Sequence, residues 1–142
     1  MKVLFAFGPN LGALGKRDPD KYGSETLAEV MQGVGDRAPD HVVEWRQSDH
    51  EGDLIGWLLA AGDEGFDAVV LNPGALSHYS LALRDAAEAC SPILIEVHQT
   101  NIYAREEFRR HSVVSPAARV VIAGAGVGGY HLALEALAWT TG

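Results

Sequence analysis

Residues 92–101 read PILIEVHQTN, and the apolar run within this stretch decides the kind of sheet that the chain forms. A short run rich in isoleucine and valine is typical of a buried strand. The strand nevertheless ends in a carboxylate and an imidazole. Because strand side chains alternate, Glu96 and His98 point to the same face. We therefore expect a buried strand whose carboxyl end presents an acid beside a histidine.

Four further apolar runs resemble this one, and they alternate with segments of helical periodicity. The five expected strands cover residues 3–7, 42–47, 68–71, 93–97 and 120–123. The expected helices cover residues 26–37, with Ser24 as N-cap, and residues 54–61, 80–89 and 130–138. This alternation predicts an α/β fold, a flavodoxin-like, doubly wound, five-stranded parallel sheet in three αβα layers. We interpret residues 1–142 as a single domain.

Composition and charge narrow the class of protein. The chain has 142 residues, 47% of them hydrophobic and 21% charged, as in ordinary globular proteins. A formal net charge of −8 disfavours binding to nucleic acid and to anionic membranes, although local arginines can still bind an anionic small substrate. No apolar stretch is long enough to span a membrane. With Cys90 as the one cysteine, no intramolecular disulfide forms, and we expect a cytoplasmic location.

In doubly wound sheets, ligands bind beyond the carboxyl ends of the strands. The loop after the first strand begins with Gly8-Pro9-Asn10, which places the amide of Asn10 near a ligand. The loop is too long and polar for an ordinary connection and is typical of a lid. Its Arg17 favours the phenolate of Tyr22, so that the tyrosine could act as a general base if the fold joins them. The alternative is a solvated loop.

The loop after the third strand, NPGALSHYS, starts at Asn72. Ser77 is expected to cap a helix, which would place His78 in the first turn and Asp85 two turns further on the same face. His78 is then either a ligand-binding group or a surface histidine. For Asp85 the alternative is an ion pair with Arg84 or another neighbour.

The loop after the fourth strand carries the acid and histidine of the opening stretch. A carboxylate fixes the tautomer of a histidine, and the pair suits general acid–base chemistry near neutral pH. Arg105 and Arg109 have i, i+4 spacing, so that one short helix would align them as a carboxylate clamp. The alternative is an exposed helix in which Glu106 and Glu107 pair with these arginines.

Three other signals are interpreted as structural. The stretch GAGVGG, residues 124–129, matches a dinucleotide fingerprint but lies at the last strand, so we predict a tight turn with close backbone packing. The six histidines lack metal-ligand spacing, and we predict no metal. Cys90 has no activating partner in the sequence and is expected to be a buried thiol.

Several motifs, taken together and in order, resemble the type II 3-dehydroquinate dehydratases. They are GPNLGALGKRDPDKYG, SDHEG, NPGALSHYS with ALRDA, and EVHQTNIYAREEFRRHS, and they span nearly the whole chain. The resemblance implies a cofactor-free lyase that converts 3-dehydroquinate to 3-dehydroshikimate and water through an enolate, in the shikimate pathway or in quinate breakdown. It also implies a homo-oligomer, commonly a dodecamer built from trimers.

The resemblance also implies roles for the catalytic residues. Tyr22 would remove the C2 proton, and Arg17 would lower its pKa. Asn10 would hold a water that stabilises the enolate. His98, oriented by Glu96 and assisted by Asn72, would protonate the departing hydroxyl.

A second set would bind substrate. His78, Asp85 and Arg109 would hold the ring hydroxyls. Backbone and hydroxyl groups at Gln99 and Thr100 would hold the carboxylate. Arg105 would support the lid.

The chain departs from the family pattern in three places. Gln99-Thr100 replaces a usual Ile or Leu followed by Ser, Gly12-Ala13 replaces bulkier residues, and Asp49 replaces a frequent asparagine. One alternative function is therefore a catalytically weak or substrate-shifted relative that binds a polyhydroxy carboxylic acid. A flavodoxin-like phosphate-cofactor binder is disfavoured, because no Ser/Thr-rich loop follows the first strand.

Overall fold

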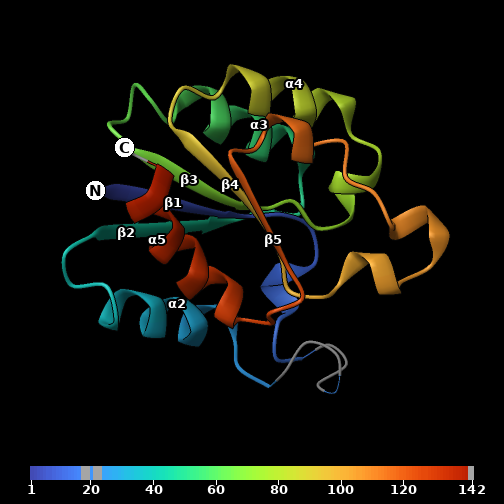
Figure 1. Cartoon of the computed structure of the whole chain (residues 1–142), viewed down its shortest axis with the longest axis horizontal. Coiled ribbons are helices and arrows are strands. Elements are labelled where there is room, and N and C mark those ends of the chain that lie inside the picture. Colours follow the sequence, from blue (N-terminus) through green and yellow to red (C-terminus); the bar gives the residue numbers. More distant parts are fainter. Residues whose placement is uncertain (17–19, 21–23, 141–142) are drawn as a thin grey trace.

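All five predicted strands form one parallel sheet in the order β2-β1-β3-β4-β5 (Figure 1). The computed structural model describes residues 1–16, 20 and 24–140. Every predicted strand boundary lies within one residue of the observed one. The strands are β1 (Lys2–Phe7), β2 (Val42–Gln47), β3 (Ala68–Asn72), β4 (Ile93–His98) and β5 (Val120–Ala123). This is the doubly wound α/β sheet expected from the sequence.

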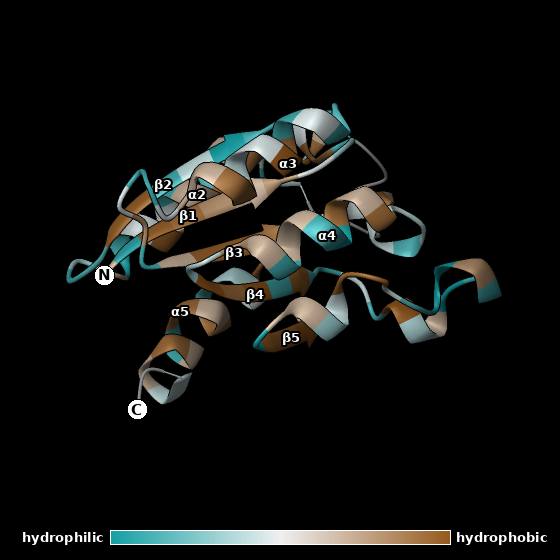
Figure 2. Ribbon diagram, turned by 90° about the horizontal axis from the view of Figure 1, so that it is seen from above, coloured by the Kyte–Doolittle hydropathy of each residue, from teal (hydrophilic) through white to brown (hydrophobic). Residues whose placement is uncertain are grey.

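Helices cover both faces of the sheet. α2 (Leu27–Asp36) and α5 (Gly128–Thr140) lie on one face, and α3 (Glu51–Ala60) and α4 (Leu81–Ala89) lie on the other (Figure 1). Each face has its own apolar cluster, because alternate residues of the central strands point to opposite sides. The central strands β3 and β4 are accordingly hydrophobic along most of their length (Figure 2). Three layers, αβα, result.

Two helix caps differ from the sequence prediction. α2 begins at Leu27, and its N-cap is Thr26, whose Oγ1 accepts a hydrogen bond from the Glu29 amide at 3.2 Å; Ser24 is not the cap. α4 is capped by Ser80, whose Oγ accepts from the Leu83 amide at 3.0 Å. Ser77 instead lies in the 3-10 helix η2 (Gly74–His78), so His78 and Asp85 do not share a helix.

The glycine-rich turn after β5 has the tight geometry predicted for it. Gly124 and Gly126 have φ values of 94° and 58°, which favour glycine. The Gly126 amide donates to the carbonyl oxygen of Gln99 at 2.9 Å, and this bond ties the turn to the end of β4. At Gly129, a Cβ would lie 2.9 Å from Cγ1 of buried Val97. α5 therefore approaches the sheet through a position that has no room for a side chain.

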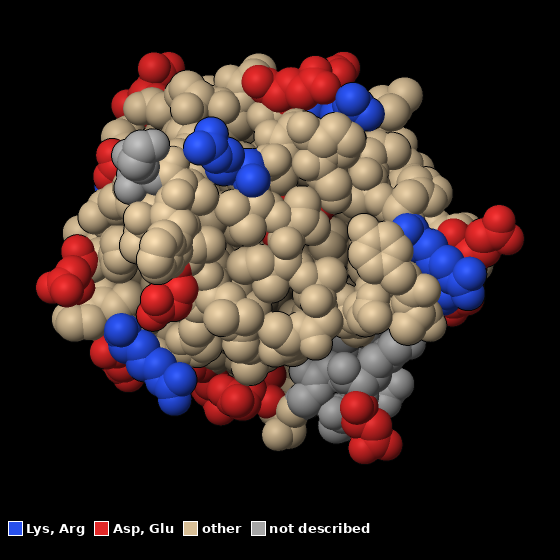
Figure 3. Space-filling model, in the orientation of Figure 1, with Lys and Arg blue, Asp and Glu red and all other residues tan. Residues whose placement is uncertain are grey.

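On the face shown in Figure 3, the basic side chains lie apart from one another, so this face presents no continuous basic surface among the described residues. Within the same described part of the chain, no helix is long and apolar enough to cross a membrane.

We predict that Gly129→Ala destabilises the protein by about 1–3 kcal/mol, because the new methyl group overpacks a contact with the rotamer-restricted Val97. Gly33→Ala, at a helical position with open space around its Cβ, is the matched control and should stabilise by about 0.5–1 kcal/mol. Urea unfolding measures both. Equal effects of the two substitutions would contradict this account of the α5 packing.

Candidate active site

A cavity of about 180 Å³ opens at the carboxyl ends of β1, β3 and β4. These strands are neighbours, so the loops that follow them meet at one edge of the sheet. Eight of the residues predicted from the sequence line this cavity: Asn10 after β1, Asn72 and His78 after β3, and His98, Gln99, Thr100, Arg105 and Arg109 at and after the end of β4.

Two of the four other predicted residues lie away from the cavity lining. Glu96 lies in β4 beside His98, completely shielded from water. Asp85 is exposed on α4 and is not among the residues that line the cavity. Arg17 and Tyr22 lie outside the described residues.

Asn10 is held in an unusual backbone conformation. Its φ of 71° is left-handed, which asparagine tolerates better than most residues. The backbone N–H of Asn10 donates to Oδ1 of Asp49 at 2.8 Å, and Nε2 of Gln47 donates to the same oxygen at 3.1 Å. These two bonds, the Asn10 bond first, hold the pKa of Asp49 below its usual range. Asp49, a departure from the family pattern, therefore holds the turn that positions Asn10.

Asn72 is fixed at both ends of its carboxamide. Its Oδ1 accepts from the Gly74 amide at 3.1 Å, and its Nδ2 donates to the hydroxyl of Tyr130 at 2.9 Å. Gly8 makes the neighbouring turn possible, because a Cβ there would lie 2.6 Å from the carbonyl oxygen of Pro73. The loops after β1 and β3 therefore pack closely beneath the cavity.

His78 forms a reciprocal pair with His111. Its Nδ1 lies 2.8 Å from the backbone oxygen of His111, while Nε2 of His111 lies 3.0 Å from the backbone oxygen of His78. A carbonyl oxygen only accepts, so Nδ1 of His78 carries a proton. Burial lowers the pKa of His78 and outweighs the opposing effect of that bond. In the resulting neutral ring, Nε2 is an acceptor.

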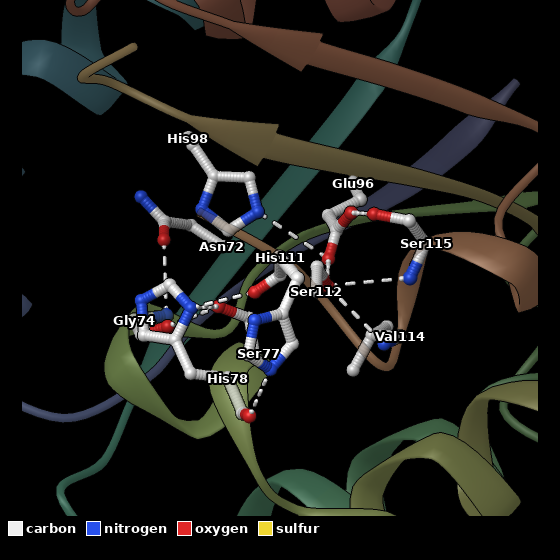
Figure 4. A network of polar contacts seen from close by, with 10 residues as sticks. All are labelled: Asn72, Gly74, Ser77, His78, Glu96, His98, His111, Ser112, Val114 and Ser115. Carbon is white, nitrogen blue, oxygen red and sulfur yellow. Dashed lines mark hydrogen bonds and ion pairs between the residues drawn. The ribbon is translucent and has the colours of Figure 1, made fainter. Parts of the chain in front are cut away.

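Glu96 and His98 form the acid–imidazole pair predicted from the sequence (Figure 4). Oε1 of Glu96 lies 3.3 Å from Nε2 of His98, and His98 is 5% exposed. Nε2 makes no hydrogen bond of standard geometry among the described residues, so its contact with Glu96 is an ion pair when the ring is protonated. The carboxylate therefore occupies one ring nitrogen and leaves the other for chemistry in the cavity.

Two serines complete the surroundings of Glu96. Ser112 Oγ donates to Oε1 at 2.5 Å, and Ser115 Oγ donates to Oε2. Burial alone would raise the pKa of Glu96, but the contacts with His98 and the two serines together hold it below its ordinary value. Glu96 is therefore ionised at neutral pH and can stabilise a protonated His98.

Gln99 lines the cavity, and its side chain is held by another protein group. Its Nε2 donates to the buried hydroxyl of Tyr130 at 2.8 Å. Thr100 remains at the cavity, where its Oγ1 accepts a 3.4 Å hydrogen bond from Arg105. The polar residue at position 99 is explained by Tyr130, a partner 31 residues away in the sequence.

The two arginines are not on one helix. Two separate 3-10 turns, η3 (Ile102–Ala104) and η4 (Glu107–Arg109), replace it, so i, i+4 alignment was the wrong reason for their proximity. Both arginines nevertheless line the cavity. Nε of Arg109 lies 2.9 Å from Oε2 of Glu106, the kind of ion pair considered as the alternative.

The sequence interpretation missed four residues that support the site: His111, Ser112, Ser115 and Tyr130. The first three lie in the arm between β4 and β5, where the motif REEFRRHS was used only for its arginines. Tyr130 was identified only as one of several apolar helix residues. A buried carboxylate requires donors, and this requirement was the one available signal for the serines.

A larger cavity, about 350 Å³, lies between α2 and α5 and is lined in part by Arg37, His41 and His131. None of the residues predicted as functional lines it. In the described part of the chain, no group of three or more His, Cys, Asp or Glu side chains is arranged to hold a metal ion.

Comparisons with known proteins agree on one family. The family described as Dehydroquinase class II matches residues 1–138. A 3-dehydroquinate dehydratase from Kineococcus radiotolerans is 52% identical over 97% of this chain and 95% of its own length. The type II dehydroquinase structure from Propionibacterium acnes superposes with a TM-score of 0.92 at 44% identity, covering 97% of this chain and 96% of that one. The enzyme from Butyrivibrio crossotus gives a TM-score of 0.94 at 40% identity, covering 97% of each chain.

We predict that Ser115→Ala lowers stability by about 1.5–3 kcal/mol at pH 7, because a buried carboxylate loses a donor. Glu96 has a depressed folded pKa, so its stabilisation is complete above the unfolded value of about 4.3 and is lost as pH falls through the folded value. The difference in unfolding free energy between wild type and Ser115→Ala should therefore become smaller as the pH is lowered from 7 to 3.

Thr140→Ala is the control for this experiment, because Thr140 Oγ1 donates to the backbone oxygen of Leu137 and not to a carboxylate. Its deficit in denaturant unfolding should not depend on pH. A Ser115→Ala deficit that is likewise constant with pH would show that Ser115 does not act through the charge of Glu96.

Proposed function

Since the chain belongs to the class II dehydroquinase family, we propose that it is a 3-dehydroquinate dehydratase. It removes water from 3-dehydroquinate and forms 3-dehydroshikimate, a reaction of the shikimate pathway. The observation that carries the proposal is the match over residues 1–138 combined with the Glu96–His98 pair beside the cavity. We further propose that it works in the cytoplasm.

His98 is the acid of the proposed mechanism. The ionised Glu96 holds Nε2 and stabilises the imidazolium, so that Nδ1 can deliver a proton to the departing C1 hydroxyl. Exclusion of water from the ring strengthens this electrostatic coupling. Asn72 assists from the neighbouring strand, because its carboxamide lines the same cavity in a fixed orientation.

Several groups at the cavity fit the rest of the substrate. Neutral His78 presents Nε2 as an acceptor for a ring hydroxyl, since its Nδ1 is occupied by His111. Arg109 supplies donors for a further hydroxyl, and Thr100 with the adjacent backbone supplies donors for the carboxylate. Asn10 lies where it could position the water that stabilises the enolate.

Proton removal from C2 is assigned to Tyr22, with Arg17 lowering its pKa. The support is the family pattern GPNLGALGKRDPDKYG in the loop after β1, whose first residues reach the cavity at Asn10 and Leu11. An adjacent guanidinium favours the phenolate, which is the basic form.

We predict that Tyr22→Phe and His98→Ala each lower kcat for 3-dehydroquinate by at least about 100-fold, because each removes a proton-transfer group. Appearance of the conjugated product is followed by ultraviolet absorbance, and circular dichroism checks that both variants are folded. Wild-type protein that produces no absorbance would contradict the dehydratase assignment and favour a binding protein for a polyhydroxy carboxylic acid. A Tyr22→Phe variant with wild-type kcat would remove Tyr22 as the base.

We also propose a homo-oligomer, a dodecamer built from trimers. Apolar side chains are exposed on the edge strand β2 and on α5: Val42 is 60%, Trp45 42% and Trp139 86% exposed. Asp85, the proposed ligand of a ring hydroxyl, does not line its own cavity. If Asp85 binds substrate, the substrate lies in the cavity of a neighbouring protomer.

Light scattering should therefore give a mass twelve times that of the 15.2 kDa chain. Asp85→Asn should raise KM and leave the mass unchanged, because it alters a substrate contact and not the fold. An active monomer would contradict both the dodecamer and the role of Asp85.

A further inference from the structure

Tyr130 joins two residues of the proposed site from beneath. It lies in the first turn of α5 and is completely buried. Its hydroxyl oxygen accepts hydrogen bonds from Nδ2 of Asn72 at 2.9 Å and from Nε2 of Gln99 at 2.8 Å. The two donors follow different strands, β3 and β4. One phenolic oxygen therefore bridges the ends of two neighbouring strands under the cavity.

The phenol ring has little freedom to move. It packs edge-on against Phe7, with ring centroids 5.2 Å apart and planes at 78°, and against Phe5 at 6.3 Å and 72°. The next residue toward the N-terminus, Gly129, sits against Val97 without room for a Cβ. Burial raises the pKa of Tyr130 to about 12, although both amide donors oppose the rise. The hydroxyl is therefore neutral in ordinary buffers and acts through its position.

The Gly74 amide and the Tyr130 hydroxyl together hold the Asn72 carboxamide in one orientation. The two ends have nearly the same shape, so that hydrogen bonds alone distinguish them. The Gly74 amide is a donor and requires Oδ1, which leaves Nδ2 for Tyr130. Without the phenolic oxygen, the carboxamide would keep one anchor and could rotate about its last torsion.

Gln99 is the second anchor of the same hydroxyl. It is 8% exposed, and its Oε1 has no hydrogen-bond partner among the described residues. An unpaired buried oxygen is unfavourable, and an apolar side chain would avoid it. Such a side chain could not hold the Tyr130 hydroxyl. The side chain of Gln99 therefore contributes through its Nε2, which donates to the Tyr130 hydroxyl.

We propose that Tyr130 is a positioning residue for the dehydration: its hydroxyl, held by Gln99, fixes the carboxamide of Asn72 in the orientation that assists His98. This inference rests on the proposed function. It assigns the side chain of Gln99 to the support of the site. The effect of losing the hydroxyl should therefore appear in kcat, where Asn72 acts, and not in KM.

Tyr130→Phe is the direct test, because it keeps the ring packing and removes only the oxygen. We expect kcat for 3-dehydroquinate to fall about tenfold, with KM unchanged within about twofold, because small misplacements of catalytic groups are costly. In an Asn72→Ala background, Tyr130→Phe should have no further effect on kcat, since the two residues act as one unit. Tyr79→Phe, at a side chain 66% exposed, is the matched control and should retain wild-type kcat.

Thermal unfolding establishes that each variant is folded under assay conditions. If Tyr130→Phe does not fold, Gln99→Leu is tested in its place. We expect Gln99→Leu to lower kcat about threefold in the wild-type background and to have no effect on kcat in the Asn72→Ala background. Wild-type kcat in the folded single variant, or equal losses in both backgrounds, would overturn the proposal. If the wild-type protein does not dehydrate 3-dehydroquinate, both the proposed function and the role of Tyr130 are wrong. If the wild-type protein is active and the folded variants have the same kcat, only the role of Tyr130 is wrong.

Discussion

A carboxylate buried without water must be compensated on every side, and Glu96 imposes this requirement on the structure around it. An unpaired charge in this position would be costly enough to protonate or to unfold the protein. His98 satisfies one part of the requirement, and Ser112 and Ser115 satisfy the rest. The arm between β4 and β5 follows a path that brings both serines over the end of β4. The arginines and His111 reach the cavity region on the same arm.

A second polar network lies on the opposite face of the sheet. Asn72 points toward the α2–α5 side, as do the alternate residues before it in β3, and Tyr130 of α5 meets it there. Glu96 points toward the α3–α4 side. The two networks therefore support His98 and Asn72 from different layers, and both side chains converge on one cavity. A doubly wound sheet has helices on both faces, so that segments on either face can supply hydrogen-bond partners to polar residues at the strand ends.

The departures from the family pattern acquire physical explanations once the chain is folded. Asp49 accepts the Asn10 amide and Gln99 donates to Tyr130, so both contact other protein groups within the fold. Neither departure removes a group that the proposed chemistry needs. Gly12 lies against the side chain of Gln47, where a Cβ would come within 2.7 Å of its Oε1.

Local sequence determined the strands and the residues at their carboxyl ends, because buried apolar runs and loop composition are local properties. Asn10, Asn72, His78 and His98 could be assigned to one edge on this basis alone. Helix caps were harder, because both Ser77 and Ser80 are residues that commonly cap helices and only the structure identifies Ser80 as the cap of α4. Only the tertiary structure decided that Ser112, Ser115 and Tyr130 serve the site and that Asp85 does not line the cavity. Those contacts join residues that are distant in sequence, and their geometry depends on how the layers pack.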